Sequence, residues 1–350
     1  GRLAGMFQFN IVFGILVAFV SNSLIGGMGD NAWRWMLGIE AVPALLYSIL
    51  CFGLPESPRW LIGRKGDRAG GTEVLRQIHP EFSPAEIEAK ADEIVEAASE
   101  STKAAGTLGQ RLRLPILLAF LIAFFNQLSG INAILYFAPR IFELTGLGEQ
   151  AALLQSVGIG VTNLVFTFVG LWLIDRLGRR TLLYIGSFGY IVSLGLCAAA
   201  FLYYAPQFQV ATSAMAVTKS IEKMENAATG AGYTEADRSE LAVAYTDAKA
   251  GLVEASSHQD YLGNAVALPA DATPESVREL AGNALTAAAE FTGSGSMIVL
   301  LCIFAFIAAH AVGQGAVIWV FISEIFPNRQ RAAGQSLGSF THWVFAALLT

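Results

Sequence analysis

The chain has 350 residues, of which 54% are hydrophobic and only 14% charged, with a mean hydropathy of +0.52 and a formal net charge of −6. This apolar share exceeds what a soluble domain of the same length needs for its core, so the composition indicates a polytopic membrane protein. No basic tract interleaved with aromatic residues is present, which argues against a nucleic-acid partner. We therefore expect the chain to lie in a lipid bilayer.

Six apolar windows reach the length of about 20 residues that crosses the hydrocarbon core of a bilayer. In chain order they are residues 6–25, 35–54, 115–137, 153–174, 182–204 and 297–321. A seventh apolar run opens near Gly334 and is still apolar at Thr350, and no initiator Met or signal-like segment precedes Gly1. We therefore expect a fragment of a longer protein, with helices missing at both ends.

Lys and Arg gather in alternate loops, and the positive-inside rule places such loops in the cytoplasm. The basic loops contain Arg59, Arg64, Lys65, Arg68 and Arg76, then Arg176, Arg179 and Arg180, then Arg329 and Arg331. The predicted location is the cell membrane, either a bacterial inner membrane or a plasma membrane. The absence of an N-x-[ST] sequon from the outer loops favours the bacterial case.

Two segments interrupt the predicted spans. Residues 55–113, here called the linker, are predicted to be cytoplasmic and helical, with a helix start at Ser83-Pro84-Ala85-Glu86. Residues 206–295, here called the insert, are Ala-rich and predicted to lie outside the cell, with five basic against twelve acidic residues and a helix start at Thr273-Pro274. We interpret the insert as a solvated cap rather than a binding module. The remaining predicted regions are 1–54, 114–205 and 296–350.

The third apolar window contains a row of uncharged hydrogen-bonding side chains, namely Asn126, Gln127, Asn132 and Tyr136. Amides and a phenol donate and accept hydrogen bonds without carrying charge, which suits a neutral polyhydroxylated solute. On an unbroken helix Gln127 and Asn132 would point about 140° apart. We therefore predict a break at Ser129-Gly130, because a glycine-interrupted span is typical of a transporter cavity.

Other spans carry matching polar and aromatic groups. They are Gln8, Asn163, Gln314, Trp319, His342 and Trp343. A pyranose has apolar faces and polar edges, so an indole beside amides matches it chemically. The alternative for any single residue is a hydrogen bond between helices, which averages about 0.6 kcal/mol in membranes.

No residue pattern predicts a catalytic, metal or cofactor site. Cys51, Cys197 and Cys302 each stand alone in an apolar run. The pattern Gly334-Gln335-Ser336-Leu337-Gly338 fits a hydrolase nucleophile elbow, but a charged turn precedes it instead of a strand, so we interpret it as small-residue helix packing. We interpret His310 as a packing or hydrogen-bonding residue, with proton transfer as the alternative. The protein is therefore predicted not to be an enzyme and to need no cofactor.

Four motifs, in this order, resemble the signature of the sugar porter family of the major facilitator superfamily. They are residues 55–61 (PESPRWL), 127–139 (QLSGINAILYFAP), 175–180 (DRLGRR) and 323–327 (SEIFP), the last followed by Arg331. The resemblance implies an all-α bundle of twelve helices in two halves around a central cavity, of which this chain supplies the fifth helix to the start of the eleventh. It also implies transport of a neutral hexose or pentose by alternating access.

The resemblance further implies roles for individual residues. The residues that it assigns to sugar contact are Gln8, Gln127, Asn132, Asn163 and Trp319. It makes Tyr136 a gate residue, and Trp343 the tryptophan that the family has in its eleventh helix. With Asn126 and Gln314, these residues are the predicted substrate site. The chain departs from the family pattern at Asn126, where a second Gln is usual, at Ala316 and Ile318, which replace prolines, and in the long insert.

A second predicted set is a latch of charges at the cytoplasmic helix ends. It consists of Glu56, Asp175, Arg179, Arg180, Glu324 and Arg331. Carboxylate and guanidinium groups can pair when the two halves close and separate when they open. The alternative is a set of ordinary exposed charges, which contribute little as pairs.

The sequence leaves several functions open. Facilitated diffusion and proton symport both fit, and Glu40 is the one acid well inside a predicted span. A non-transporting sugar sensor and a carrier of polyols such as inositol are the alternatives to a monosaccharide carrier. A monomer is the expected functional form.

Overall fold

The computed structural model describes residues 2–29, 31–103, 112–229, 233–257, 272–292, 295–327 and 330–349. Within these ranges the chain forms helices and turns and contains no strand. Six helical segments are long and apolar enough to cross a membrane, at Gln8–Ile25, Ala32–Cys51, Arg113–Glu143, Glu149–Leu177, Arg179–Thr229 and Gly295–Ile325. They contain the six apolar windows, except that the first window begins two residues before Gln8 and the second runs three residues past Cys51. The chain divides into two compact units, which are described separately.

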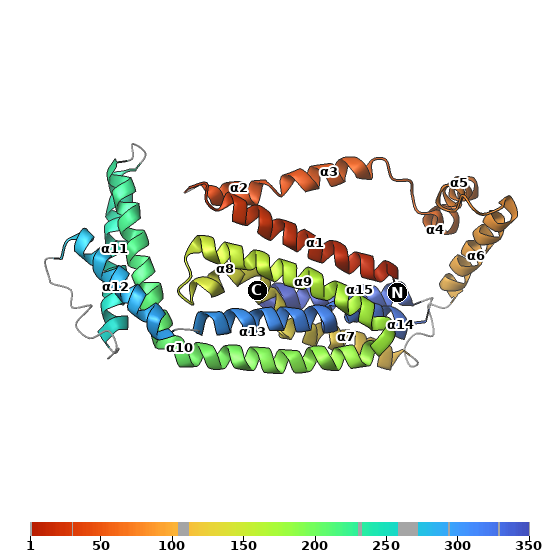
Figure 1. The fold of residues 1–350 in the computed structure, drawn as a ribbon. Coiled ribbons are helices and arrows are strands. Elements are labelled where there is room, and N and C mark those ends of the chain that lie inside the picture. The colour runs from red at the N-terminus through yellow and green to blue at the C-terminus, as the bar shows by residue number, and fades with distance from the viewer. Residues whose placement is uncertain are drawn as a thin grey trace. The chain divides into compact units, whose positions relative to one another are not determined.

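The first unit contains five long membrane helices and the insert (Figure 1). The membrane helices are α1 (Arg2–Ile25), α8 (Ile131–Glu143), α9 (Glu149–Leu177), α10 (Arg179–Thr229) and α13 (Gly295–His310). Helix α1 packs along α9, and α10 packs along α13. The core is apolar, and Phe142, Ile159 and Phe306 have no exposed surface. Glycines allow close approaches, since a Cβ at Gly160 would lie only 3.0 Å from Leu16 and 3.2 Å from Phe19.

Two membrane helices are interrupted at glycine-containing turns. Between α7 (Arg113–Leu128) and α8, Gly130 has φ +78° and ψ 14°, a left-handed conformation that side chains other than glycine rarely adopt. This confirms the break predicted at Ser129-Gly130. After α13 the chain forms a π-helical turn, η4 (Ala311–Gly315), before α14 (Ala316–Ile325). Such turns are rare inside helices and are frequently found at functional sites.

The second unit contains α7, α14 and α15 (Arg331–Leu349), together with α3 (Ala41–Cys51), most of α2 (Ala32–Gly38) and the linker. Helices α7 and α14 share an apolar core that includes Ala123, Ile318 and Ile322. A side chain at Gly338 of α15 would collide with Ile322, and one at Gly334 would collide with Phe326. Both glycines therefore act as small packing residues, as predicted, and the helix that carries them rules out the strand-to-helix turn of a nucleophile elbow.

The linker forms a small helical bundle with its own core. It consists of α4 (Pro58–Trp60), the π-helical turn η1 (Leu61–Lys65), α5 (Arg68–Ile78) and α6 (Pro84–Lys103), and residues 104–111 lie outside the described residues. Ile62, Leu75 and Ile87 are buried together. Helix α6 begins where the sequence predicted, and Glu86 accepts hydrogen bonds from the backbone N–H and the hydroxyl of Ser83 at 2.8 Å each.

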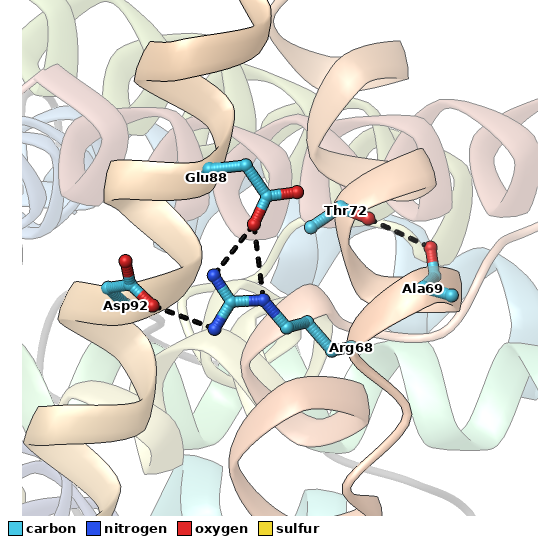
Figure 2. A network of polar contacts seen from close by, with 5 residues as sticks. All are labelled: Arg68, Ala69, Thr72, Glu88 and Asp92. Carbon is cyan, nitrogen blue, oxygen red and sulfur yellow. Dashed lines mark hydrogen bonds and ion pairs between the residues drawn. The ribbon is translucent and has the colours of Figure 1, made fainter.

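An ion-pair network joins α5 to α6 on the linker surface (Figure 2). The Arg68 guanidinium donates to Glu88 Oε2 from Nε and Nη2 at 3.1 and 2.7 Å, and its Nη1 lies 2.7 Å from Asp92 Oδ1. Hydrogen bonds to Asp92 and Glu88 hold the pKa of Arg68 above its ordinary value. All three side chains are well exposed, so the network orients the two helices more than it stabilises them.

The insert is a three-helix bundle whose first helix is the continuation of α10. Helix α10 runs without interruption through Pro206 to Thr229, so the boundary predicted between residues 205 and 206 falls inside one helix. Helices α11 (Glu235–Ser257) and α12 (Pro274–Thr292) pack against this extension around Val217, Leu252 and Ala281. Helix α12 begins at the predicted Thr273-Pro274 start, while residues 230–232 and 258–271 lie outside the described residues.

Contacts to the end of α8 and the start of α9 fix the base of the insert. Lys219 Nζ of the insert lies 2.6 Å from Glu149 Oε2, and the hydroxyl of Ser296, the residue directly after the insert, donates to the carbonyl oxygen of Thr145 at 2.9 Å. In addition, a side chain at Gly146 would come within 2.9 Å of Ala211. The insert is therefore fixed at its base by side chains as well as by the continuous helix.

Candidate functional site

A cluster of polar and aromatic side chains lies in the second unit, where α7, α14 and α15 meet. Gln127 is 2% exposed, and its amide nitrogen lies 2.8 and 2.9 Å from Nδ1 and Nε2 of His342. The Asn126 amide nitrogen lies 3.4 Å from the same Nδ1, with Asn126 itself 3% exposed. Two neighbouring amides on α7 therefore converge on one imidazole of α15.

Two indoles flank this imidazole. The Trp319 ring of α14 lies 5.1 Å from the His342 ring at 60°, and the Trp343 ring lies 5.1 Å away at 82°. The Gln335 amide, seven residues and about two helical turns before His342, donates to the carbonyl oxygen of Trp319 at 2.9 Å. This hydrogen bond ties α15 to α14 beside the cluster. Trp343 is more than half exposed, so it lies at the border of the cluster.

The structure thus brings together four predicted site residues, Asn126, Gln127, Trp319 and Trp343. The cluster also contains His342. This residue was named among the polar and aromatic groups of the spans, but it was not one of the predicted site residues. The available signal was a His-Trp pair inside an apolar helix, since an ionisable side chain in a membrane span is uncommon and usually functional.

The first unit carries the other predicted site residues, which are distributed over four elements. Gln8 of α1 and Asn163 of α9 are buried, on two helices that pack along each other. Asn132 and Tyr136 lie one turn apart on α8, and Tyr136 is 57% exposed. Gln314 lies in the π-helical turn η4, and its amide nitrogen donates to the Ser187 hydroxyl of α10 at 3.0 Å. Gln314 is therefore oriented by α10.

His310 makes a hydrogen bond inside the first unit, as one of its two interpretations predicted. Its Nδ1 lies 2.6 Å from the Tyr190 hydroxyl of α10, and the two rings are stacked at 10°. His310 is 8% exposed and directly precedes η4, where a side chain at Gly315 would lie 3.1 Å from it. The pair therefore fixes α10 against the start of the π-helical turn.

The predicted latch charges of the first unit have local partners. Arg179 Nη1 lies 3.7 Å from Asp175 Oδ1 and donates to the carbonyl oxygen of Ile174 at 3.3 Å. Arg180 Nε donates to the Tyr184 hydroxyl at 3.2 Å. These contacts hold the guanidinium groups at the turn between α9 and α10.

The latch charges of the second unit lie at helix ends. Glu324 is one residue from the end of α14, and Arg331 is the first residue of α15. Glu56 is exposed in the segment before α4. In the described part of the chain, no group of three or more His, Cys, Asp or Glu side chains is placed to hold a metal ion.

Comparison with known proteins identifies the family. The model of the sugar (and other) transporter family matches residues 1–219 and 280–350. The chain belongs to this family, the sugar porters of the major facilitator superfamily. The unmatched residues, 220–279, all lie in the insert, which is thus the part of this sugar porter that departs from the family pattern.

Individual relatives agree with this assignment. The D-xylose-proton symporter of Escherichia coli (strain K12) is 34% identical over 213 residues, 59% of this chain and 42% of that protein. The probable inositol transporter 2 of Arabidopsis thaliana is 29% identical over 354 residues, 98% of this chain and 60% of that protein. A solved structure of a proton:xylose symporter bound to 6-bromo-6-deoxy-D-glucose is 26% identical with a TM-score of 0.57, covering 100% of this chain and 55% of the other.

The sugar porter chain therefore spans about half the length of the relatives it matches. As a family member it is an all-helical, multi-pass protein of the cell membrane, in agreement with its six apolar helical segments. The family model and the structural neighbours describe transporters, which is the function class that the resemblance implied.

Proposed function

We propose that the full-length protein carries a neutral monosaccharide, a hexose or a pentose, across the cell membrane by alternating access. The cluster of Asn126, Gln127, Trp319 and His342 is the observation that supports this proposal most directly. It presents amides beside an indole, which match the hydroxyl edges and the apolar face of a sugar ring. Gln8, Asn132, Asn163, Gln314 and Trp343 are the other proposed solute contacts, and Tyr136 is the proposed gate.

The proposed cycle requires no covalent chemistry, so the protein is proposed not to be an enzyme. Binding of the solute shifts a conformational equilibrium between outward-open and inward-open states. The break at Gly130 and the π-helical turn Ala311–Gly315 lie in the two interrupted helices, and interrupted helices of this kind form the solute sites of many transporters. A monomer is the proposed working unit. Protons are the candidate coupling ion, because a curated relative and a similar solved structure are both named as a proton symporter of xylose.

The latch is part of the same proposal. Glu56, Asp175, Arg179, Arg180, Glu324 and Arg331 are proposed to pair in one state of the cycle and to exchange partners in the other. Glu324→Gln is then expected to increase the inward-open population. The measurement is the labelling rate of a cysteine introduced into the cytoplasmic cavity, and an unchanged rate would count against the latch.

An inositol carrier is the second candidate. The Arabidopsis thaliana relative that matches 98% of this chain is named a probable inositol transporter, and a Bacillus subtilis relative is named a major myo-inositol transporter. Inositol presents a ring of hydroxyl groups like those of a pyranose, so the same amides suit both.

Counterflow uptake into proteoliposomes that contain the full-length protein distinguishes these candidates. The panel consists of labelled D-xylose, D-glucose and myo-inositol, and liposomes without protein provide the background. Uptake of a hexose or pentose above background supports the proposal, and uptake of myo-inositol alone supports the second candidate. Binding without uptake would instead indicate a sensor, and no uptake or binding of any panel member would refute sugar transport.

A further inference from the structure

His342 occupies the centre of the cluster, and its protonation state decides how the neighbouring amides are oriented. An uncharged imidazole has one nitrogen that accepts a hydrogen bond and one that donates, whereas a charged imidazolium only donates. Both amide nitrogens, from Asn126 and Gln127, are directed at this ring. An amide nitrogen is a donor, and Nδ1, which both amides face, accepts only when it carries no proton, so this orientation of the amides fits an uncharged ring.

Protonation of His342 would therefore place its ring N–H groups opposite the amide N–H groups of Asn126 and Gln127, and all of these groups are donors. To accept from the imidazolium, the Gln127 amide would have to rotate and direct its oxygen at the ring. When the Gln127 amide directs its oxygen at the ring, that oxygen accepts from a ring N–H, which an imidazolium supplies at both nitrogens. The pair of Gln127 and His342 thus has two hydrogen-bonding arrangements, and the imidazole selects between them.

The elements of the unit that surround His342 offer no described charge to hold its proton. Helix α7 has one charged residue, Arg113, which is fourteen residues from Gln127 and about 21 Å away along the helix. Helix α14 has Glu324, five residues beyond Trp319, and α15 itself has Arg331, eleven residues before His342. The groups that contact the ring are amides and indoles, which are uncharged.

We propose that His342 is a titratable residue of the solute site and that its uncharged form is the one that binds solute. This inference rests on the proposed function, since it assigns a role within that site. A sugar that enters the cluster displaces water from the imidazole. Loss of water destabilises the charged ring more than the uncharged ring, so solute and proton compete.

The first test needs no solute. Intrinsic fluorescence of the purified full-length protein is titrated from pH 8 to pH 4, because an imidazolium 5.1 Å from the Trp319 ring quenches indole emission. We expect a quenching step in the wild type that is absent from His342→Gln, which keeps an uncharged hydrogen-bonding side chain. In Trp319→Phe the step should be smaller but still present, because the Trp343 ring is also 5.1 Å from the imidazole. His79→Gln, at an exposed histidine of the linker, is the matched control and is expected to keep the step. A wild type without any step, or a step that persists in His342→Gln, would overturn the inference.

The second test measures counterflow of the best-transported panel member, with the same pH on both sides of the liposome membrane. The half-saturation concentration of the wild type is expected to rise roughly fivefold or more on acidification, the usual size of coupling between two ligands. His342→Gln should remove this rise, and the comparison is between the pH profiles of the two proteins, so a lower uptake rate in the variant does not affect it. If His342→Gln does not fold, His342→Asn takes its place.

Equal pH profiles in the wild type and the transporting variant would refute the role of His342. If no solute is carried at any pH, sugar transport fails as the function, while the fluorescence titration still decides whether His342 titrates.

Discussion

Gln127→Ala is the substitution expected to weaken solute binding most directly. Gln127 is 2% exposed and its amide lies 2.8 Å from His342 Nδ1, so truncation removes a buried hydrogen bond and any hydrogen bond to the solute. Leaving a buried polar partner unsatisfied costs about 1–3 kcal/mol. If the full amount appears in binding, the half-saturation concentration rises about 5- to 150-fold.

The assay is counterflow into proteoliposomes over a range of solute concentrations, at pH 8, where an ordinary histidine is uncharged. Gln127→Asn, which keeps an amide on a shorter side chain, is expected to fall between Ala and the wild type. Gln209→Ala, at an exposed glutamine of α10, is the matched control and should behave as the wild type. A half-saturation concentration within about twofold of the wild type, in a Gln127→Ala protein that elutes as a single folded species, would refute the assignment of Gln127 to the site.

Three further predictions concern the fold. Gly130→Ala places a side chain in the left-handed region and is expected to lower the stability of the fold by about 1–2 kcal/mol, measured by thermal melting. Gly195→Ala, at a position of α10 with open space around it, is the control and is not expected to lower the stability. Equal melting temperatures of the two variants would contradict the break at Gly130. Ile87→Ala leaves a cavity at a position of the linker core that is 1% exposed, and it is expected to lower the stability of the linker by about 2–5 kcal/mol. Val95→Ala, at an exposed position, is expected to lower it much less. Amide hydrogen exchange across α5 and α6 measures both effects, and similar exchange in the two variants would argue against a linker core. Hydrogen bonds from the Ser83 backbone N–H and hydroxyl lower the pKa of Glu86, so this contact stabilises α6 above the unfolded pKa of about 4.3 and is lost as the pH falls through the lower folded pKa. Amide hydrogen exchange in the first turn of α6 should therefore rise on acidification in the wild type and vary less with pH in Glu86→Gln. Identical exchange profiles in the two proteins would exclude the contact.

The sequence was most informative where the signal is local. Apolar windows of membrane-spanning length, the helix starts at Ser83-Pro84 and Thr273-Pro274, and the break at Gly130 each depend on a few adjacent residues, and the structure contains all of them. A glycine beside polar residues in an apolar span is predictable because few other residues tolerate the left-handed conformation.

Contacts between distant residues were decided by the tertiary structure. Gln127 and His342 are 215 positions apart, and only the packing of α7, α14 and α15 brings the amide to the imidazole. The direction of Gln314 depends on α10, which supplies Ser187. Likewise, α10 continues through Pro206 because its far half packs into the core of the insert, which offsets the lost backbone hydrogen bond. Composition and periodicity determine which segments are helices and which faces are apolar, but the choice of partner for each polar side chain depends on how those helices pack.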